Sequence, residues 1–315
     1  MSINLRARLP FNFHSVVKSH GWVQLAPFGF DEDSSTLTYV DRLASGRVVE
    51  YSISGSRDGL QLQAGALTKA ELEEAREKIR WMFALDADFS AFYAASHWEP
   101  KLRNAGKLAR GRVLRSPTLF EDVVKTILTT NTLWAATKRM NLNLINLFGE
   151  PLLNHRPERS GAQSKGETTA TTKTTATTET KRAFPTPQAI AASSPEEIKE
   201  KVRVGYRAPT IHELAVRVAS GEFDLEALKT SSLPTLELRK ELIKIKGVGP
   251  YAAANLLLIL GRPDFIPIDS WALKLVSNEW YRGKPITAKE VEKRFEKWGE
   301  FKGFAFWFWE WRDME

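Results

Sequence analysis

The chain of 315 residues contains no cysteine. This absence excludes disulfides, thiolate zinc sites, iron–sulfur clusters and a cysteine nucleophile. No segment approaches the roughly 20 consecutive apolar residues that a membrane-spanning helix needs. The basic N-terminal segment MSINLRARLPFNFH lacks the apolar stretch of a signal peptide. We therefore expect a cytoplasmic protein without thiol chemistry, associated with the nucleoid if the source is bacterial.

The composition shows a positive charge and a large share of aromatic residues. Lys and Arg total 45 against 38 for Asp and Glu, which gives a formal net charge of +7. This balance favours polyanionic partners, nucleic acid first. Hydrophobic residues make up 43% of the chain, enough for a buried core. The chain also has 10 Trp and 17 Phe, several of them close together near the C-terminus.

The hydrophobic pattern changes near residue 66. LTYVDRL, RVVEYSISG and GLQLQAG alternate with period two and predict a small antiparallel sheet, preceded by a helix or strand at 13–18. Thr68 and Glu71 have the spacing of a capping box and predict a helix through Phe83. The rest of the chain shows helical periodicity. We expect an α+β protein, with a mixed sheet domain at 1–95 and a mainly helical core at 96–315.

A Thr-rich segment interrupts the helical part at about 158–182, with TTATTKTTATTET at its centre. It has no large apolar side chain that could offset the entropy of ordering the chain, about 1–2 kcal/mol per residue. We expect a disordered insertion between two helices. A tether for a partner is the alternative.

The segment ELIKIKGVGPYAAANLLLILGRPDFIPIDSWALKLV, at 241–276, carries the strongest functional signal. It predicts a helix at 236–245, a Gly-Val-Gly turn at 247–249, and a second helix at 251–260 with Pro250 in its first turn. Asp269 then precedes a third helix at 270–276, where it is expected to act as an N-cap. An ordinary helix corner and a hairpin that binds DNA phosphate through backbone N–H groups are both compatible with this pattern.

Several motifs in order resemble the helix-hairpin-helix (HhH-GPD) DNA glycosylase superfamily, in particular its alkyladenine (3-methyladenine DNA glycosylase II, AlkA-like) and 8-oxoguanine branches. GVGPYAAANLLLIL followed by IPIDSWALKL is similar to the hairpin and catalytic segment of that family. RSPTLFEDVVKTILTTNTLWAATKRM, FPTPQAIA, VGYRAPTIHELA and FEKWGEFKGFAFWFWEW resemble its other elements. The resemblance spans about 115–311 without the Thr-rich segment. It implies a small N-terminal β-sheet domain followed by the helical HhH-GPD core.

The resemblance also implies roles for individual residues. Asp269 corresponds to the catalytic carboxylate. The base pocket corresponds to Tyr251, Phe306, Trp307 and Trp309. The DNA wedge and the contacts to the opposite strand correspond to Thr130, Asn131, Tyr206 and Arg207, with Leu133 beside them. The phosphate contacts correspond to Gly247, Val248 and Gly249, with Lys244 and Lys246, and the carbonyls of Ile243, Ile245 and Val248 correspond to those that hold a bridging Na⁺ or K⁺. For Asn131, a helix C-cap is the alternative. The basic run at 101–115 is expected either to line the DNA or to form a solvated face.

Two departures from the family pattern bear on the reaction. Members that also cleave the sugar–phosphate backbone carry a lysine where this chain has Tyr251, so we expect a monofunctional enzyme that uses water. Phe306 stands where 8-oxoguanine enzymes place a glutamine that reads the base edge. The aromatic rings instead favour a cationic alkylated purine, because a cation over an aromatic face gains roughly 0.5–2 kcal/mol.

These observations predict a monofunctional glycosylase of base excision repair that hydrolyses the N-glycosidic bond of a flipped, alkylated purine of the 3-methyladenine type. It should need no cofactor and act as a monomer on damaged double-stranded DNA, with no role for a membrane. The same fold acting on oxidised (8-oxoguanine) or deaminated bases is one alternative. A non-catalytic DNA-binding protein is another.

Overall fold

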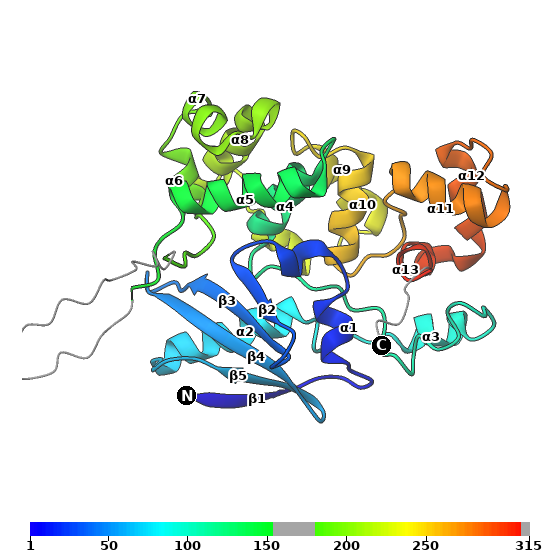
Figure 1. Ribbon diagram of the computed structural model, residues 1–315, viewed down its shortest axis with the longest axis horizontal. Helices are drawn as coiled ribbons and strands as arrows, with labels where there is room; N and C mark the ends of the chain where they lie inside the picture. Colours follow the sequence, from blue (N-terminus) through cyan, green and yellow to red (C-terminus); the bar gives the residue numbers. More distant parts are fainter. Residues whose placement is uncertain (154–179, 310–315) are drawn as a thin grey trace, which may run out of the picture.

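The computed structural model describes residues 1–153 and 180–309. A five-stranded antiparallel sheet forms the N-terminal part, and helices cover its upper side and extend to the right in Figure 1. The predicted α+β class is confirmed. The elements of the N-terminal part are β1 (Ser2–Arg6), α1 (Phe13–Val17), the 3-10 turn η1 (Gly21–Gln24), β2 (Phe28–Asp31), β3 (Thr36–Arg42), β4 (Val48–Ser56), β5 (Gly59–Gln63), α2 (Lys69–Met82) and α3 (Ser90–Ser96).

The sheet has the strand order β1-β5-β4-β3-β2. The three strands predicted from alternation are β3, β4 and β5, and the segment at 13–18 forms the helix α1. The edge strands β1 and β2 were not predicted, because each is short and its pairing depends on a neighbour. Tyr39 of β3 lies opposite Tyr51 of β4, and both rings are buried.

The helix α2 begins as its sequence predicts. The Thr68 Oγ1 accepts the Glu71 N–H at 3.3 Å, and the Glu71 carboxylate accepts the Thr68 N–H at 2.9 Å. This reciprocal pair satisfies two N–H groups that the first turn of a helix otherwise leaves free. Ile79 and Met82 then bury one side of α2 in the same hydrophobic cluster as the sheet.

The helical core follows, and its longer helices hold the hairpin and the residues around it (Figure 1). Its elements are α4 (Leu119–Thr129), α5 (Trp134–Phe148), α6 (Pro187–Ala191), α7 (Pro195–Glu197), η2 (Ile198–Val202), η3 (Gly205–Arg207), α8 (Ala208–Ala219), η4 (Glu226–Thr230), α9 (Thr235–Ile243), α10 (Pro250–Ile259), α11 (Ser270–Trp280), α12 (Ala288–Phe295), η5 (Glu296–Phe301) and α13 (Lys302–Trp307).

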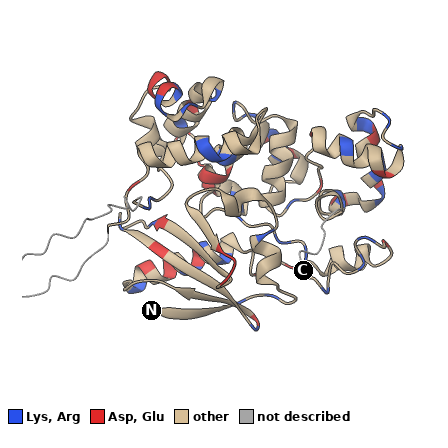
Figure 2. Ribbon diagram, viewed as in Figure 1, with Lys and Arg blue, Asp and Glu red and all other residues tan. Residues whose placement is uncertain are grey.

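A buried polar cluster joins the sheet to α4. The Lys125 ammonium, fully buried, donates to Glu121 at 2.5 Å, and the same carboxylate accepts the Tyr39 hydroxyl of β3 at 2.6 Å. The Trp22 indole of η1 donates to Asp122 at 2.7 Å. Figure 2 shows acidic residues of α4 in red. A buried charge is tolerated when its partners satisfy it, so this cluster fixes how α4 sits on the sheet.

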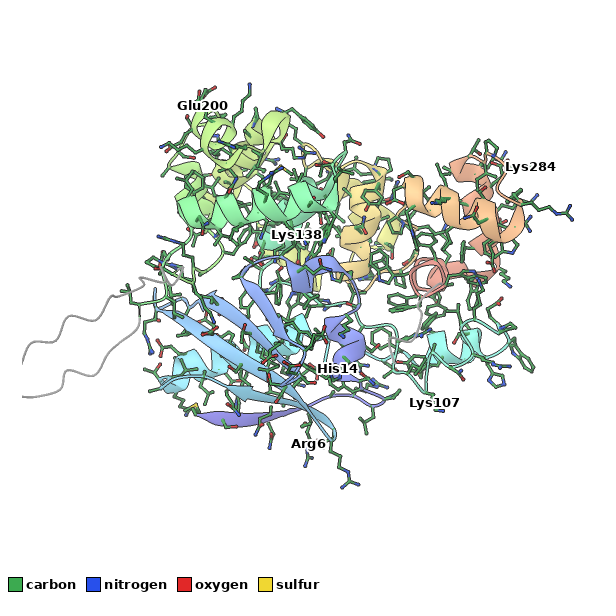
Figure 3. The ribbon with its side chains drawn as sticks, in the orientation of Figure 1. Arg6, His14, Lys107, Lys138, Glu200 and Lys284 are labelled. Atoms are coloured by element: carbon green, nitrogen blue, oxygen red, sulfur yellow. The ribbon has the colours of Figure 1, made fainter. Side chains whose placement is uncertain are left out.

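The basic run at 101–115 does not form one exposed face. Arg110, Arg112 and Arg115 are buried. The Arg112 guanidinium donates to the carbonyls of Arg8 (2.6 Å) and Pro10 (2.8 Å), so it ties the segment after β1 to the helical part. Charged residues elsewhere in the chain, such as Arg6 and Lys284 at the edge of the molecule, extend outward (Figure 3).

Most of the predicted insertion at 158–182 lies outside the described residues. Within the described part, Leu152 N–H donates to the Lys181 carbonyl at 2.8 Å, and Pro151 pairs with Arg182 in an antiparallel bridge. Residues 181 and 182 are thus held against the segment that follows α5. Over the described ranges, no helix combines the length and the apolar character required to cross a bilayer.

Candidate functional site

Asp269 lies at the N-terminus of α11 and caps it, as predicted. Its Oδ1 accepts the Ala272 N–H at 2.9 Å. Among the described residues, no hydrogen bond is made to its Oδ2. The positive end of the helix dipole favours negative charge at this position. The carboxylate is therefore held through one oxygen while the other remains available.

Asp269 and Tyr251 both line three neighbouring cavities. The turn cavity, about 670 Å³, is bordered by the turn between α4 and α5 and by the Gly247–Gly249 hairpin. The His20 cavity, about 280 Å³, is bordered by His20, Asn255 and Trp307. The Trp271 cavity, about 330 Å³, is bordered by Trp271, Phe306 and Trp307. The two smaller cavities fall near the lower end of the usual range for ligand pockets, about 300–1,000 Å³, which suits a single base.

The hairpin between α9 and α10 has the predicted form. Gly247 has φ +81°, a conformation that costs a residue with a Cβ roughly 1–2 kcal/mol. The Val248 N–H donates to the Ile245 carbonyl at 2.9 Å and closes the turn. Pro250 occupies the first turn of α10, directly after Gly249 as N-cap. The N–H groups at the start of α10 thus lie beside the turn cavity and are suited to an anion.

The two lysines predicted at the hairpin carry ion pairs. The Lys244 ammonium lies 2.7 Å from Glu241, and the Lys246 ammonium lies 2.9 Å from Glu213. All four side chains are substantially exposed, so these pairs are weak and exchange easily with other anions.

The turn between α4 and α5 displays the predicted wedge residues. The Thr130 hydroxyl caps α4 by donating to the Ile127 carbonyl at 2.8 Å, and Asn131 follows with φ +47°. Asn131 therefore occupies the left-handed position that ends a helix, and its amide lies 3.5 Å from the Tyr206 hydroxyl. Leu133, the N-cap of α5, is 81% exposed. Its apolar side chain therefore packs little against the described part of the protein.

Arg207 lies beside these residues but is 6% exposed. Its guanidinium donates to the carbonyls of Ile127 and Thr130, at the end of α4. Arg207 therefore holds the turn, whereas Tyr206, 64% exposed, is the member of the predicted pair that faces outward.

Of the C-terminal aromatic residues predicted for the base pocket, two border a cavity and one lies in the core. Trp307 borders both smaller cavities, and its indole donates to the Ser19 carbonyl at 2.9 Å. Phe306 borders the Trp271 cavity at its edge but is 1% exposed, packed 5.6 Å from Phe295. Trp309 lies in the core, with ring centroids 5.0 Å from Trp280 and 5.2 Å from Phe295, and borders none of the three cavities. The structure therefore does not place Trp309 at the site.

Tyr251 faces Asp269 across the site. Burial of the phenol and the nearby Asp269 charge both raise the pKa of Tyr251. The hydroxyl consequently stays protonated and the side chain neutral. A neutral aromatic side chain thus occupies the hairpin position where family members that also cleave the sugar–phosphate backbone carry a lysine.

The sequence analysis missed several residues that border these cavities, among them Asn255, His20 and Trp271. Asn255 lies four residues after Tyr251, on the same face of α10, and is the one polar residue of an otherwise apolar helix after its first turn. That spacing could have revealed it. His20 and Trp271 had no such signal, because His20 reaches the site only through the tertiary packing of the N-terminal part against α13.

Comparisons with known proteins find similarity to DNA glycosylases. The curated DNA-3-methyladenine glycosylase of Bacillus subtilis is 27% identical over 241 residues, which cover 75% of this chain and 72% of that protein. The structure of MBOgg1 in complex with a low-affinity DNA ligand has a TM-score of 0.68 and 27% identity, covering 96% of this chain and 93% of the other. The 3-methyladenine DNA glycosylase of Archaeoglobus fulgidus has a TM-score of 0.70 and 21% identity, with 98% and 97% covered.

The family model described as HhH-GPD superfamily base excision DNA repair protein matches residues 124–301, more than half of the chain. The match includes the turn after α4, the hairpin and Asp269. The chain therefore belongs to the HhH-GPD superfamily of base excision DNA repair proteins.

Proposed function

We propose that this protein is a monofunctional DNA glycosylase that hydrolyses the N-glycosidic bond of a flipped, alkylated purine in damaged duplex DNA, acting as a monomer. One observation carries the proposal: Asp269 borders the turn cavity beside the Gly247–Gly249 hairpin and also borders both smaller cavities, whose volumes suit a single base. The name of the Bacillus subtilis relative supports the choice of an alkylated base.

Asp269 is suited to the chemistry at the sugar. Departure of the base leaves oxocarbenium character on the deoxyribose, and a fixed carboxylate stabilises that charge. The bond between its Oδ1 and the Ala272 N–H keeps the side chain in place during the reaction. Its second oxygen can orient or deprotonate the attacking water.

The turn after α4 supplies the group that replaces the extruded base. A glycosylase must take its target out of the stack, and an inserted side chain fills the space that is left. Leu133 is exposed and apolar, and Asn131 next to it lies within reach of Tyr206. We assign the insertion to Leu133 and the contacts with the opposite strand to Asn131, Thr130 and Tyr206.

The hairpin supplies the grip on the backbone. The amides of Gly247, Val248 and Gly249 would bind a phosphate of the damaged strand. Among the described residues, the carbonyls of Ile243 at the end of α9 and of Val248 in the hairpin accept no backbone hydrogen bond, and the Ile245 carbonyl accepts only the Val248 N–H. Such free carbonyl oxygens fit a Na⁺ or K⁺ ion, whose positive charge would reinforce phosphate binding.

Tyr251 and Trp307 define the reaction type and the base. Tyr251 has no amine and cannot form the Schiff base that a lysine forms, so water is the nucleophile and an abasic site is the product. The faces of Tyr251 and Trp307 favour an electron-poor base, because alkylation at N3 or N7 makes a purine cationic.

The substitution Asp269→Asn tests this proposal. The amide keeps the size of the side chain but removes the negative charge, so the variant should bind duplex DNA while releasing methylated bases at least about 100-fold more slowly. Release of free base from methylated duplex DNA measures the loss. Asp264→Asn, which changes another acid of the same segment that borders none of the three cavities, is the matched control and should stay active. A fully active Asp269→Asn would refute the assignment.

Two further measurements address the alternatives. Borohydride should trap no covalent complex with DNA, and trapping would show that the enzyme is bifunctional. A panel with 3-methyladenine, 7-methylguanine, 8-oxoguanine and hypoxanthine should give fastest release of the alkylated bases. Release of 8-oxoguanine or hypoxanthine alone would move the activity to another lesion, and binding without any release would indicate a non-catalytic protein.

A further inference from the structure

His20 contributes a side chain from the N-terminal part to the wall of the His20 cavity. Its Nε2 lies 2.6 Å from the carbonyl oxygen of Leu114. The ring centroid lies 4.6 Å from that of Trp22 and 6.2 Å from that of Trp307, the latter nearly edge-on at 69°. The imidazole therefore has a defined position between two indoles, beside Tyr251 and Asp269.

The hydrogen bond to Leu114 fixes the tautomer of His20. A carbonyl oxygen can only accept, so Nε2 must carry the proton. Burial, opposed by this bond and assisted by the charge of Lys125, lowers the pKa of His20 to about 4. The ring is thus neutral at physiological pH and its Nδ1 is a hydrogen-bond acceptor. Over the described residues, no donor is paired with Nδ1.

A second acceptor lies in the same cavity. The Asn255 amide nitrogen donates to the Tyr251 carbonyl at 3.2 Å, and this bond orients the amide. Within the described ranges, its oxygen Oδ1 has no donor. His20 and Asn255 therefore both present acceptors to this cavity, and a base that carries N–H groups can satisfy them.

The loop at 18–20, between α1 and η1, is held in place without the Nδ1 atom of His20. The Ser19 hydroxyl oxygen accepts the Leu114 N–H at 2.8 Å, and the Ser19 carbonyl accepts the Trp307 indole at 2.9 Å. With the bond from His20 Nε2, these contacts hold the loop to its surroundings. The second ring nitrogen is left over for a ligand.

We propose that His20 determines base specificity: its Nδ1 accepts a hydrogen bond from an N–H group of the flipped purine in the His20 cavity, with the Asn255 Oδ1 as a second acceptor. This inference depends on the proposed glycosylase function. It selects a purine that carries an exocyclic amine or a ring N–H on the edge facing His20. A base that presents only acceptors there shields both groups from water and leaves them without a hydrogen-bond donor.

Two variants of His20 separate the role of Nδ1 as an acceptor from the role of Nε2 as the donor to the Leu114 carbonyl. In His20→Gln the amide nitrogen can replace Nε2 as the donor to Leu114, but nothing replaces Nδ1. In His20→Asn the amide oxygen can take the place of Nδ1, while the donor to Leu114 is lost. Single-turnover release of 3-methyladenine should fall about tenfold or more in His20→Gln and recover to within about threefold of wild type in His20→Asn. Both should bind DNA with an abasic site as wild type does, since no base fills the cavity.

Nitrogen NMR of ¹⁵N-histidine protein tests the hydrogen bond directly. Nδ1 should be unprotonated in the free protein, and its resonance should shift on addition of free 3-methyladenine together with abasic duplex DNA. A proton on Nδ1 in the free protein, an unshifted Nδ1 resonance, or His20→Gln with the wild-type rate would each overturn the inference. Failure of the proposed function is distinguishable, because the wild-type protein itself would then release no alkylated base.

Discussion

At the scale of single residues, burial displaces the pKa values of two neighbouring groups in opposite directions. The pKa of His20 falls from 6.5 to about 4. The pKa of Asp122 rises from 3.8 to about 7, because burial outweighs the hydrogen bonds from Ser116 and Trp22 and the charge of Lys125. Over the described residues, Asp122 Oδ2 lies buried without a partner, as a protonated carboxyl allows. The two groups therefore contribute slopes of opposite sign to the pH dependence of stability.

The substitution Asp122→Asn should remove one of these slopes. Between about pH 4 and 7 the folded protein holds a proton on Asp122 that the unfolded chain has lost, so this group makes stability fall as pH rises. The stability of Asp122→Asn relative to wild type should therefore improve from pH 5 to pH 8 by a few kcal/mol, at about 1.4 kcal/mol per pKa unit. Urea unfolding at a series of pH values measures it.

His20→Gln is the control for this prediction. Between about pH 4 and 6.5 the unfolded chain holds a proton on His20 that the folded protein lacks, so His20 makes stability rise with pH. Its relative stability should improve as the pH falls, the reverse of Asp122→Asn. Parallel curves for the two variants would show that neither pKa is displaced as described.

Individual site residues were predictable where the chain itself encodes the geometry. Asp269 precedes an apolar helix and caps it, and Gly247 has the left-handed conformation that the hairpin pattern requires. Trp309 was misplaced because the C-terminal aromatic run contains both core and cavity residues, and only packing against Trp280 decides between them. His20 could not be predicted, because its ring packs near Trp307, at the other end of the chain.

At the scale of elements, the two hairpin glycines have different roles. We expect Gly247 to matter for stability and Gly249 for DNA binding, and substitution of each can test this. A Cβ at Gly247 would lie 2.7 Å from the Thr210 methyl in a conformation with φ +81°, whereas a Cβ at Gly249 meets nothing within 4 Å. Gly247→Ala should destabilise the protein by about 1–3 kcal/mol. Gly249→Ala should leave stability within about 0.5 kcal/mol and weaken DNA binding several-fold, because its methyl group stands where a phosphate approaches the amides.

Thermal unfolding and fluorescence-anisotropy titration with duplex DNA separate the two effects. Equal destabilisation by both alanines would contradict the backbone argument. Unchanged DNA affinity of Gly249→Ala would mean that the phosphate lies elsewhere than at the start of α10.

The turn between α4 and α5 makes a second prediction at this scale. Leu133 is 81% exposed, so Leu133→Ala should change stability by less than about 0.5 kcal/mol. Release of damaged base should fall about 10–100-fold, because extrusion of a base then lacks the side chain that fills the stack. Fluorescence of 2-aminopurine placed next to the lesion reports the flipping step. Leu153→Ala, at another leucine with 76% exposure, is the control and should flip bases normally.

Elements with a strong local signal were predicted well. The capping box of α2 and Pro250 at the start of α10 mark helix boundaries in the sequence itself. The strands β1 and β2 carry no such signal, because a short edge strand owes its conformation to the partner strand. The expected range of the insertion included residues 181 and 182, which pair with 151 and 152, because composition alone cannot reveal a backbone pairing.

At the scale of the whole molecule, the sheet and the central helices share one hydrophobic cluster. Tyr39 of β3, Ile79 of α2, Phe120 of α4 and Leu257 of α10 all belong to it. A second cluster packs α3 against α11, α12 and α13 and meets α10 at Leu258. The boundary near residue 95, which the sequence pattern suggests, therefore crosses a continuous core instead of a solvated linker.

This continuity predicts that the sheet and the central helices unfold together. Exposing the sheet alone would uncover the apolar faces of α2, α4 and α10 and break the bonds of Arg112 to the carbonyls of Arg8 and Pro10. Native-state hydrogen exchange of the full chain should therefore give the slowest amides of β4 and of α10 the same opening free energy, equal to that of global unfolding. Amides of α12, which lies in the second cluster, can exchange through a smaller opening. If the amides of β4 instead had an opening free energy several kcal/mol lower than those of α10, residues 1–95 would be an independent folding unit. His20 would then belong to a domain docked beside the base cavity, not to a shared core.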